Sequence, residues 1–267
     1  MSLINVSNLT FSYEGSYDNI FENVSFQIDT DWKLGFIGRN GRGKTTFLNL
    51  LLGKYAYSGN ISSTVKFEYF PYDVEDKSLY TIEVMKSICT ECMDWEIFRE
   101  ISLLDVQEDA LYRPFNTLSN GEQTKVLLAA LFLTASCFLL IDEPTNHLDI
   151  DARNVVQNYL KRKKGFILVS HDRSLLDQCV DHILSINKTN IEIQKGNFTS
   201  WWENKTLQDN FELAENKKLL KEIGRLSYAA KRSSNWSNKV EKSKYGTTNS
   251  GSKLDKGYVG HKAAKAM

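Results

Sequence analysis

The 267-residue sequence contains few of the residues and segments that mark unusual protein classes. It has only three prolines and four cysteines, too few for a Pro-rich disordered chain or a disulfide-based scaffold. It has no run of about 18 apolar residues, the length that a membrane-spanning helix requires, because Thr134 and Ser136 interrupt the longest stretch at 126–141. No basic segment followed by an apolar one occurs at the start, so we expect no secretory signal and a cytoplasmic location.

The chain also lacks a net charge, because its two parts carry opposite charges of equal size. Residues 1–202 hold 19 basic and 26 acidic side chains, a balance of −7, whereas residues 203–267 hold 14 basic and 7 acidic side chains, a balance of +7. An acidic body with a basic tail indicates a polyanionic partner. A solvated helical face is the alternative that charge alone leaves open.

The apolar pattern changes at the same place as the charge. Before residue 202, short apolar runs at 34–38, 137–141 and 165–170 predict buried strands among helical stretches, as in an α/β protein. Alternating residues at 6–13 and 20–28 predict antiparallel strands with one wet face, and 81–104 predicts short helices. After residue 202, apolar residues at helical spacing predict one long amphipathic helix that fades near Ser233.

The clearest motif is GRNGRGKTT at residues 38–46, which matches G-x-x-x-x-G-K-[ST] at every fixed position. Glycines let a backbone wrap a phosphate with its N–H groups inward, and a helix beginning near Gly43 adds the positive end of its dipole. Lys44 can reach the β- and γ-phosphates, and the Thr45 hydroxyl can ligate Mg²⁺. The predicted nucleotide-binding residues here are Gly38, Asn40, Gly41, Arg42, Gly43, Lys44, Thr45 and Thr46.

A second motif, FLLIDE at 138–143, places two carboxylates at the end of an apolar strand. Sheets of α/β proteins bind ligands at the carboxyl ends of their strands. We expect Asp142 to hold Mg²⁺ through water and Glu143 to polarise the water that attacks the phosphate. Adjacent carboxylates can also simply start a turn before Pro144, but the phosphate motif favours the catalytic interpretation.

Two further motifs resemble those of ATP-binding cassette (ABC) proteins. Residues 118–123, LSNGEQ, resemble the ABC signature motif, although Asn120 stands where the family has glycine. This resemblance implies that Ser119, Gly121 and Glu122 contact a nucleotide held by a partner cassette. Residues 143–149, EPTNHLD, resemble the hallmark of the ABC-F subfamily, cassette proteins without membrane domains that act on ribosomes, and the resemblance places Asp149 in the D-loop.

The same resemblance assigns roles to three other segments. SHDR at 170–173 resembles the switch segment, in which His171 senses the γ-phosphate. LTFSY at 9–13 resembles the A-loop, in which Tyr13 stacks on adenine; Phe11 on the same strand face is the rival candidate, and core packing is the alternative. The family's Q-loop glutamine, a Mg²⁺ contact, is replaced by Tyr72, which cannot supply a carbonyl ligand, so we expect altered metal coordination or altered coupling to the helical subdomain.

The resemblance covers essentially the whole chain and implies its domains. Residues 1–202 are expected to form an α/β P-loop cassette with a mainly parallel core sheet, an antiparallel N-terminal β-subdomain and a helical subdomain at about 73–135. Residues 203–267 are expected to form the first helix, tip loop and return-helix start of an interdomain linker, with GNFTS at 196–200 resembling the element before it. Full-length members carry a second cassette, so we expect this chain to be a fragment cut inside the linker.

The basic tail and the short segment before the signature motif indicate which group of ABC-F proteins the chain resembles. The segment 72–118 is too short for the arm that housekeeping ABC-F translation factors insert there, and armless members resemble the Lsa-type antibiotic-resistance group. The basic linker suits RNA, and Trp236, Tyr245 and Tyr258 could stack on bases or serve only in packing. The expected partners are therefore the ribosome, through 23S rRNA and P-site tRNA, and a second cassette or a homodimer mate, with no membrane.

The resemblance thus implies an ATP- and Mg²⁺-dependent ATPase that protects the ribosome from lincosamide, streptogramin A or pleuromutilin antibiotics. Lys44, Asp142 and Glu143 come from one cassette and Ser119 from another, so we expect weak hydrolysis by this chain alone. The alternatives are an ABC-F translation factor without a resistance role and an ATPase subunit of a membrane transporter.

Two other patterns favour ordinary structural roles. CTEC at 89–92 has metal-ligand spacing, but no second Cys/His pair lies near it, so we expect packing within helices. KRKK at 161–164 lies between a helix and a strand, and we expect a solvated helix end.

Overall fold

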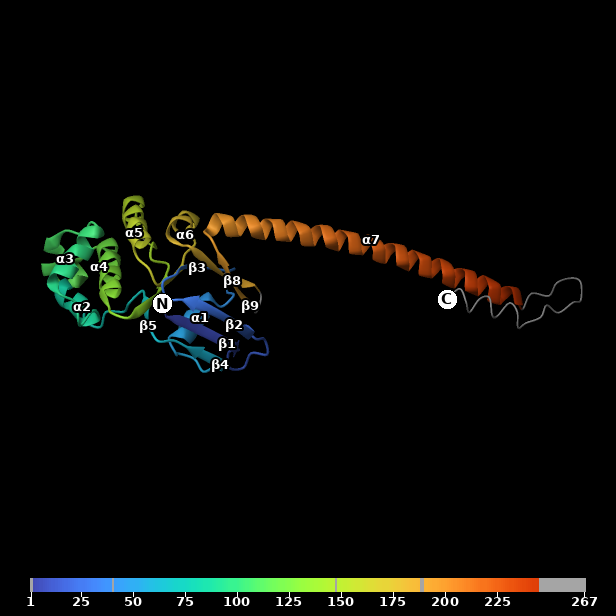
Figure 1. The fold of residues 1–267 in the computed structure, drawn as a ribbon, viewed down its shortest axis with the longest axis horizontal. Helices are drawn as coiled ribbons and strands as arrows, with labels where there is room; N and C mark the ends of the chain where they lie inside the picture. The colour runs from blue at the N-terminus through green and yellow to red at the C-terminus, as the bar shows by residue number, and fades with distance from the viewer. Residues whose placement is uncertain (1, 40, 147, 188–189, 245–267) are drawn as a thin grey trace, which may run out of the picture. The chain divides into compact units, whose positions relative to one another are not determined.

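A computed structural model of the chain describes residues 2–39, 41–146, 148–187 and 190–244 (Figure 1). The chain divides into two compact units, Met1–Trp202 and Glu203–Met267. Asn40, Tyr245, Tyr258 and the rest of the expected linker from residue 245 onward lie outside the described residues.

The first unit contains a three-stranded antiparallel sheet in the order β2-β1-β4. Its strands are β1 (Leu3–Phe11), β2 (Phe21–Asp29) and β4 (Ser58–Ser62). In β1 the buried positions change from even to odd numbers, because the register shifts between Val6 and Leu9 around Asn8, which has a φ of 52°. This bulge keeps the apolar side chains on one face of the sheet, as the expected one-sided strands require.

A six-stranded sheet forms the core, in the order β5-β6-β7-β3-β8-β9. The strands are β3 (Lys33–Ile37), β5 (Lys66–Phe70), β6 (Cys137–Asp142), β7 (Phe166–Val169), β8 (His182–Asn187) and β9 (Asn190–Lys195). Every pairing is parallel except that of β8 with β9. The carboxyl ends of β3, β6 and β7 therefore meet at one edge of the sheet.

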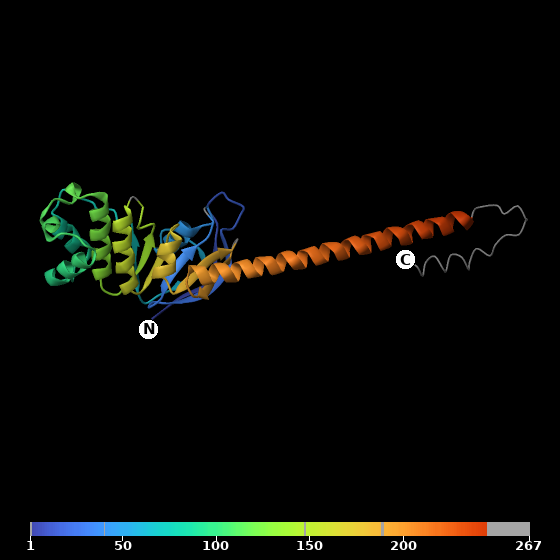
Figure 2. The ribbon, with the colours of Figure 1, turned by 90° about the horizontal axis from the view of Figure 1, so that it is seen from above.

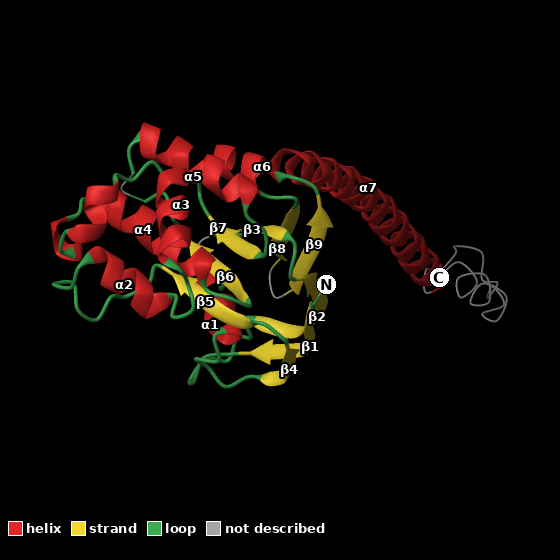
Figure 3. Ribbon diagram, turned by 60° about the vertical axis from the view of Figure 1, so that its left-hand side comes forward, coloured by secondary structure: helices red, strands yellow, loops and turns green. Residues whose placement is uncertain are grey.

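Helices on one side of this sheet and the small sheet on the other bury its central strands β3, β6, β7 and β8 (Figure 3). Phe138 and Leu140 of β6 pack with α1 (Lys44–Leu51) and the antiparallel sheet, whereas Leu139 and Ile141 pack with the opposite helices. Those helices include α5 (Ile150–Arg162) and α6 (Arg173–Cys179), together with the buried part of a third helix at Asn120–Leu133. Burial on both faces explains the continuous apolar strand runs in the sequence.

The expected helical subdomain is made of α2 (Thr81–Ile88), α3 (Asp94–Leu103) and α4 (Asn120–Leu133), with short 3₁₀ turns at Glu108–Tyr112 and Phe115–Thr117 (Figure 2). In α4 every residue from Val126 to Leu131 is buried, so this helix is enclosed rather than amphipathic.

The interpretation of CTEC as simple helix packing was incomplete. Cys89 is buried in the helical core, but it also forms a disulfide with Cys92. The chain turns between α2 and α3 and brings the two Cα atoms to 5.5 Å, within the reach of a disulfide. Among the described residues, no group of three or more His, Cys, Asp or Glu side chains could hold a metal ion.

A buried ion-pair network joins α3 to the end of α5. The carboxylate of Glu100, 1% exposed, accepts a hydrogen bond from the Tyr159 hydroxyl at 2.6 Å and pairs with Lys163 and Arg99. Burial alone would raise the pKa of Glu100, but the hydrogen bonds from Lys163 and Tyr159 hold that pKa below its ordinary value. The hydrogen bonds and ion pairs of Glu100 are therefore what stabilise its ionised form in the buried site.

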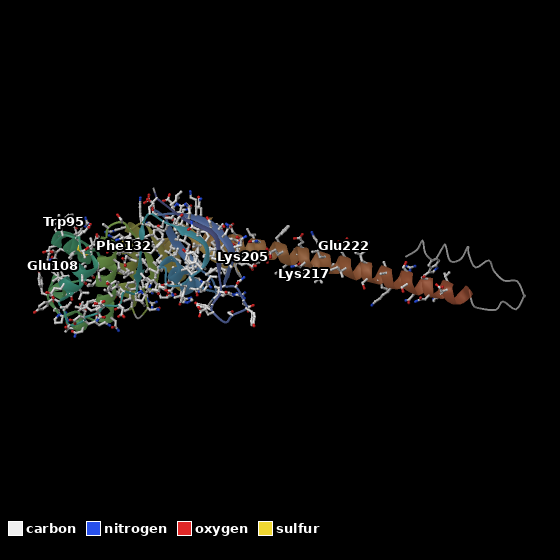
Figure 4. All side chains as sticks on the ribbon, turned by 90° about the horizontal axis from the view of Figure 1, so that it is seen from below. Trp95, Glu108, Phe132, Lys205, Lys217 and Glu222 are labelled. Carbon is white, nitrogen blue, oxygen red and sulfur yellow. A yellow bond between two sulfur atoms is a disulfide. The ribbon has the colours of Figure 1, made fainter. Side chains whose placement is uncertain are left out.

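Helix α7 spans Phe198–Lys244, so the prediction that it fades near Ser233 was wrong. Serine and asparagine at 233–238 cost only a few tenths of a kcal/mol each in a helix, and each residue added to an existing helix gains one backbone hydrogen bond. Charged side chains such as Lys205, Lys217 and Glu222 project from it (Figure 4). Many of its apolar residues are also exposed, such as Leu219 at 50% and Phe211 at 70%. Over the described part of the chain, no helix has the length and apolarity needed to cross a membrane.

Candidate functional site

The loop between β3 and α1 has a backbone that only glycine can form. Gly43 has a φ of 94°, and a Cβ atom there would lie 2.6 Å from Ile20 Cγ2. Gly41 also has a positive φ, of 75°. The Lys44 ammonium donates a hydrogen bond to the Gly38 carbonyl oxygen at 2.8 Å, which folds the side chain back over the loop. Burial lowers the pKa of Lys44, and Asp142 and Glu143 oppose that shift.

A cleft of about 480 Å³ opens beside this loop. It is lined by Tyr13, Ile20, Gly41, Gly43, Lys44, Thr45, Thr46, Asp142, Glu143, Val169 and His171. All but Ile20 and Val169 are residues that the sequence predicted for the site. The cleft lies where the carboxyl ends of β3, β6 and β7 meet, the usual ligand position in α/β sheets.

The donor set on one side of the cleft fits a magnesium ion. Thr45 Oγ1 lies 3.3 Å from Asp142 Oδ2, so one hydroxyl and one carboxylate face each other across the loop. Mg²⁺ prefers such oxygen ligands, keeps several waters and takes the remaining ligands from substrate phosphates. Thr45 and Asp142 are therefore the residues that would hold the metal.

Glu143 is held in a costly conformation next to this pair. Its φ is 50°, a left-handed backbone that costs a residue with a side chain on the order of 1–3 kcal/mol. Its amide donates to the Val169 carbonyl at 2.9 Å, which fixes the turn after β6. Among the described residues, nothing hydrogen-bonds its buried Oε1 atom, and His171 Nε2 lies 3.6 Å away.

The carboxyl of Glu143 also has a shifted pKa. Burial raises this pKa, the nearby His171 opposes the rise, and the neighbouring Asp142 adds to it. A carboxylate with a raised pKa and a free acceptor atom is suited to take a proton from water.

Tyr13, beyond the end of β1, lies at the cleft, whereas its rival Phe11 lies in the core. Tyr13 is 42% exposed and Phe11 only 6%. The Tyr13 hydroxyl is 2.8 Å from Thr46 Oγ1, and its ring contacts Phe11 and Tyr55 edge-on. These contacts fix the ring while leaving part of it accessible for stacking.

Several predicted site residues do not line the cleft in the single chain. Ser119 and Glu122 cap α4, since Glu122 Oε2 accepts bonds of 2.8 Å from both the amide and the hydroxyl of Ser119. Asp149 caps α5 through the Ala152 amide, also at 2.8 Å. Gly121 begins α4 next to Leu148, and Arg42 is exposed. The predicted contacts of Ser119, Gly121 and Glu122 with a nucleotide on another cassette stay predictions, as do the roles predicted for Asp149 and Arg42.

Comparison with known proteins agrees with this geometry. Residues 21–146 match the ABC transporter family. This part of the chain has the fold of an ABC-type ATP-binding cassette. The cassette also resembles a chain from an inward-facing structure of a metal-chelate type ABC transporter, with a TM-score of 0.61 at 20% identity over 73% of this chain and 84% of that one. At this identity the likeness establishes the fold.

Two curated relatives have more informative names. The ABC transporter F family member 5 of Arabidopsis thaliana is 27% identical over 76% of this chain and 30% of its own length. The ribosome protection protein VmlR of Bacillus subtilis is 31% identical over 72% of this chain and 35% of its own length. The chain thus spans about a third of the length of these relatives.

Two aromatic residues of the cassette site were missed in the sequence. Tyr69 of β5 donates a hydrogen bond to Asp142 Oδ2 at 3.1 Å, and Tyr55 contacts Tyr13. Burial, together with the charge of Asp142, raises the pKa of Tyr69, so its hydroxyl stays a donor. Tyr72, at the expected Q-loop position, packs against the helical core cluster instead. Only the parallel pairing of β5 with β6 brings Tyr69 to the site, and sequence patterns do not give that pairing.

Proposed function

We propose that the chain is the nucleotide-driven cassette of an ABC-F ATPase that binds the ribosome and protects it from antibiotics of the peptidyl-transferase centre. The observation that carries the ATPase part is Glu143, whose buried, unbonded carboxylate oxygen lies beside Lys44 and Asp142 in one cleft. Support for the ABC-F part comes from the EPTNHLD string and from relatives named as an F family member and a ribosome protection protein.

The polar residues of the cleft divide the work of binding and hydrolysing ATP between them. The loop amides and Lys44 bind the phosphates, and the exposed part of the Tyr13 ring receives the adenine. Thr45 and Asp142 would hold magnesium, which would supply positive charge to offset that of the phosphates. Glu143 accepts a proton from the attacking water as the γ-phosphoryl group leaves ADP, and His171 lies next to that carboxylate.

The signature residues imply that turnover needs a second cassette. Ser119 and Gly121 do not line the cleft of their own chain, so donors for the outer side of the γ-phosphate come from another cassette. That partner is the second cassette of a longer protein or a homodimer mate. The chain alone should therefore hydrolyse ATP slowly, and its rate per chain should rise with concentration if a homodimer forms.

The second unit supplies the proposed contact with the ribosome. Described residues of α7 include basic side chains that are exposed, namely Lys217, Lys218, Lys221, Arg225, Lys231, Arg232 and Lys239. A basic helix binds the phosphates of ribosomal or transfer RNA with little sequence preference. Such binding should weaken as salt rises.

Replacing Lys44 by Met should weaken ATP binding. The substitution removes the ammonium that faces the phosphates but keeps a side chain of similar length. We expect a loss of at least about tenfold in affinity, the effect of roughly 1.4 kcal/mol, by calorimetry with the whole chain. Lys86→Met is the matched control, because Lys86 pairs with Asp94 on the exposed surface of the helical subdomain and should leave affinity unchanged. Equal affinities of Lys44→Met and wild type would refute the nucleotide site.

The resistance role is tested by growth. Bacteria that express the protein with this cassette should grow at lincosamide concentrations that stop cells carrying an empty vector. Glu143→Gln should remove this protection. Equal inhibition of the wild-type and empty-vector cells, together with ribosome binding, would indicate a translation factor; co-purification with a permease would indicate a transporter subunit.

A further inference from the structure

Two hydroxyl groups converge on one oxygen of the Asp142 carboxylate. Tyr69 Oη donates to Oδ2 from 3.1 Å, and Thr45 Oγ1 donates to the same atom from 3.3 Å. Within residues 2–39, 41–146, 148–187 and 190–244, no hydrogen bond reaches Oδ1. The two oxygens of this carboxylate are therefore not equivalent: one is bound by the protein and the other is available.

The Tyr69 hydroxyl is held in place by its surroundings. Tyr69 lies on β5, where it pairs in parallel register with Leu140, two residues before Asp142 on β6. Its ring packs against the core cluster that contains α1, and the Lys54 ammonium lies 5.5 Å from the ring centre. A donor on a packed aromatic ring loses little conformational freedom when it forms its hydrogen bond.

We propose that Tyr69 is a positioning residue for the divalent metal of this site. By binding Oδ2 it fixes the rotation of the Asp142 carboxylate, and Oδ1 stays free of protein donors and available to the metal or its water. This proposal rests on the proposed nucleotide function and adds to it a residue outside the sequence motifs. The partners that orient a metal ligand typically contribute about 10–100-fold to metal affinity.

Tyr69 and Tyr72 lie three positions apart but differ in their contacts. Tyr72 occupies the position where the resemblance expects a metal contact, but it packs against the helical core cluster. Among the described residues, nothing hydrogen-bonds the Tyr72 hydroxyl, whereas that of Tyr69 contacts Asp142 directly. Removing the hydroxyl from each tyrosine in turn therefore gives a matched pair of variants.

The test compares metal-dependent with metal-independent binding, using the whole chain. ADP affinity is measured by calorimetry with Mg²⁺ and with EDTA, and Mn²⁺ affinity in the presence of ADP is measured by electron paramagnetic resonance. Tyr69→Phe should weaken Mn²⁺ binding by on the order of tenfold. Its ADP affinity in EDTA should match that of the wild type, and Tyr72→Phe should match the wild type in every measurement.

A double-variant cycle identifies the route of the effect. If Tyr69 acts through Asp142, Tyr69→Phe should add little to the loss already caused by Asp142→Asn. Equal Mn²⁺ affinities of Tyr69→Phe and wild type would overturn the proposal, as would an equal loss of ADP affinity with and without metal, which would show a merely structural role. A wild-type chain that binds no ADP in either condition would instead overturn the nucleotide function itself.

Discussion

Lys163→Met should lower the free energy of unfolding by about 3–5 kcal/mol, the effect of removing one partner of a buried ion pair. The substitution leaves the carboxylate of Glu100, which is 1% exposed, without its main cationic partner. Arg99 cannot replace it fully, because its own side chain is 54% exposed and its pairing is screened by water. Urea unfolding of the whole chain, followed by circular dichroism, measures the change.

Two companion variants show whether the buried charge is the cause. Lys164→Met removes an exposed neighbouring ammonium and should change stability by no more than about 0.5 kcal/mol. Combining Lys163→Met with Glu100→Gln removes both charges and should recover part of the loss. Equal destabilisation by Lys163→Met and Lys164→Met would contradict the assignment.

The same network predicts how stability depends on pH. The pKa of Glu100 is lower in the folded chain than in the unfolded one, so the folded state favours the ionised form. The contribution of Glu100 to the free energy of unfolding is fully present above the pKa that a glutamate has in the unfolded chain. It is lost as the pH falls through the lower pKa of the folded chain. Lys163→Met should flatten this acid-side loss of stability.

Glu143→Gln should slow ATP hydrolysis by about 10²–10⁴-fold, the range typical for a lost general base. The amide keeps the size and position of the side chain but cannot accept a proton from water. ATP should still bind, because Lys44 and the loop amides are unchanged. Single-turnover assays with excess protein measure the chemical step even when turnover is slow.

Glu14→Gln serves as the control for that variant, since Glu14 is exposed and does not line the cleft. It should hydrolyse ATP at the wild-type rate. Wild-type hydrolysis by Glu143→Gln would exclude this carboxylate as the base, and a loss of ATP binding in the same variant would assign it a role in affinity instead.

Local patterns predicted much of the fold. Apolar residues on both faces of β6 predicted a strand buried on two sides, and Phe138 and Leu139 indeed contact opposite core clusters. The phosphate loop was equally predictable, because the positive φ values of Gly41 and Gly43 are conformations that glycine adopts most readily.

The features that the sequence did not reveal depend on distant contacts or on competing signals. The hydrogen bond from Tyr69 to Asp142 spans 73 positions and requires the pairing of β5 with β6. The disulfide of Cys89 and Cys92 requires the turn between α2 and α3. Helix α7 continues beyond the predicted end near Ser233 because helix propagation outweighs the weak helix propensity of residues 233–238.

The turn after β6 has a consequence for how this sequence can change over generations. Position 143 combines a backbone that suits glycine or asparagine with a buried carboxylate that has no hydrogen-bond donor at Oε1 among the described residues. Both features favour replacing the glutamate if folding stability alone is selected. A carboxylate retained at position 143 lowers the stability of the fold. Proteins keep such destabilising residues at sites where the residue acts on a ligand. If stability alone were selected, Glu143 should be replaced sooner than the glycines of the loop between β3 and α1.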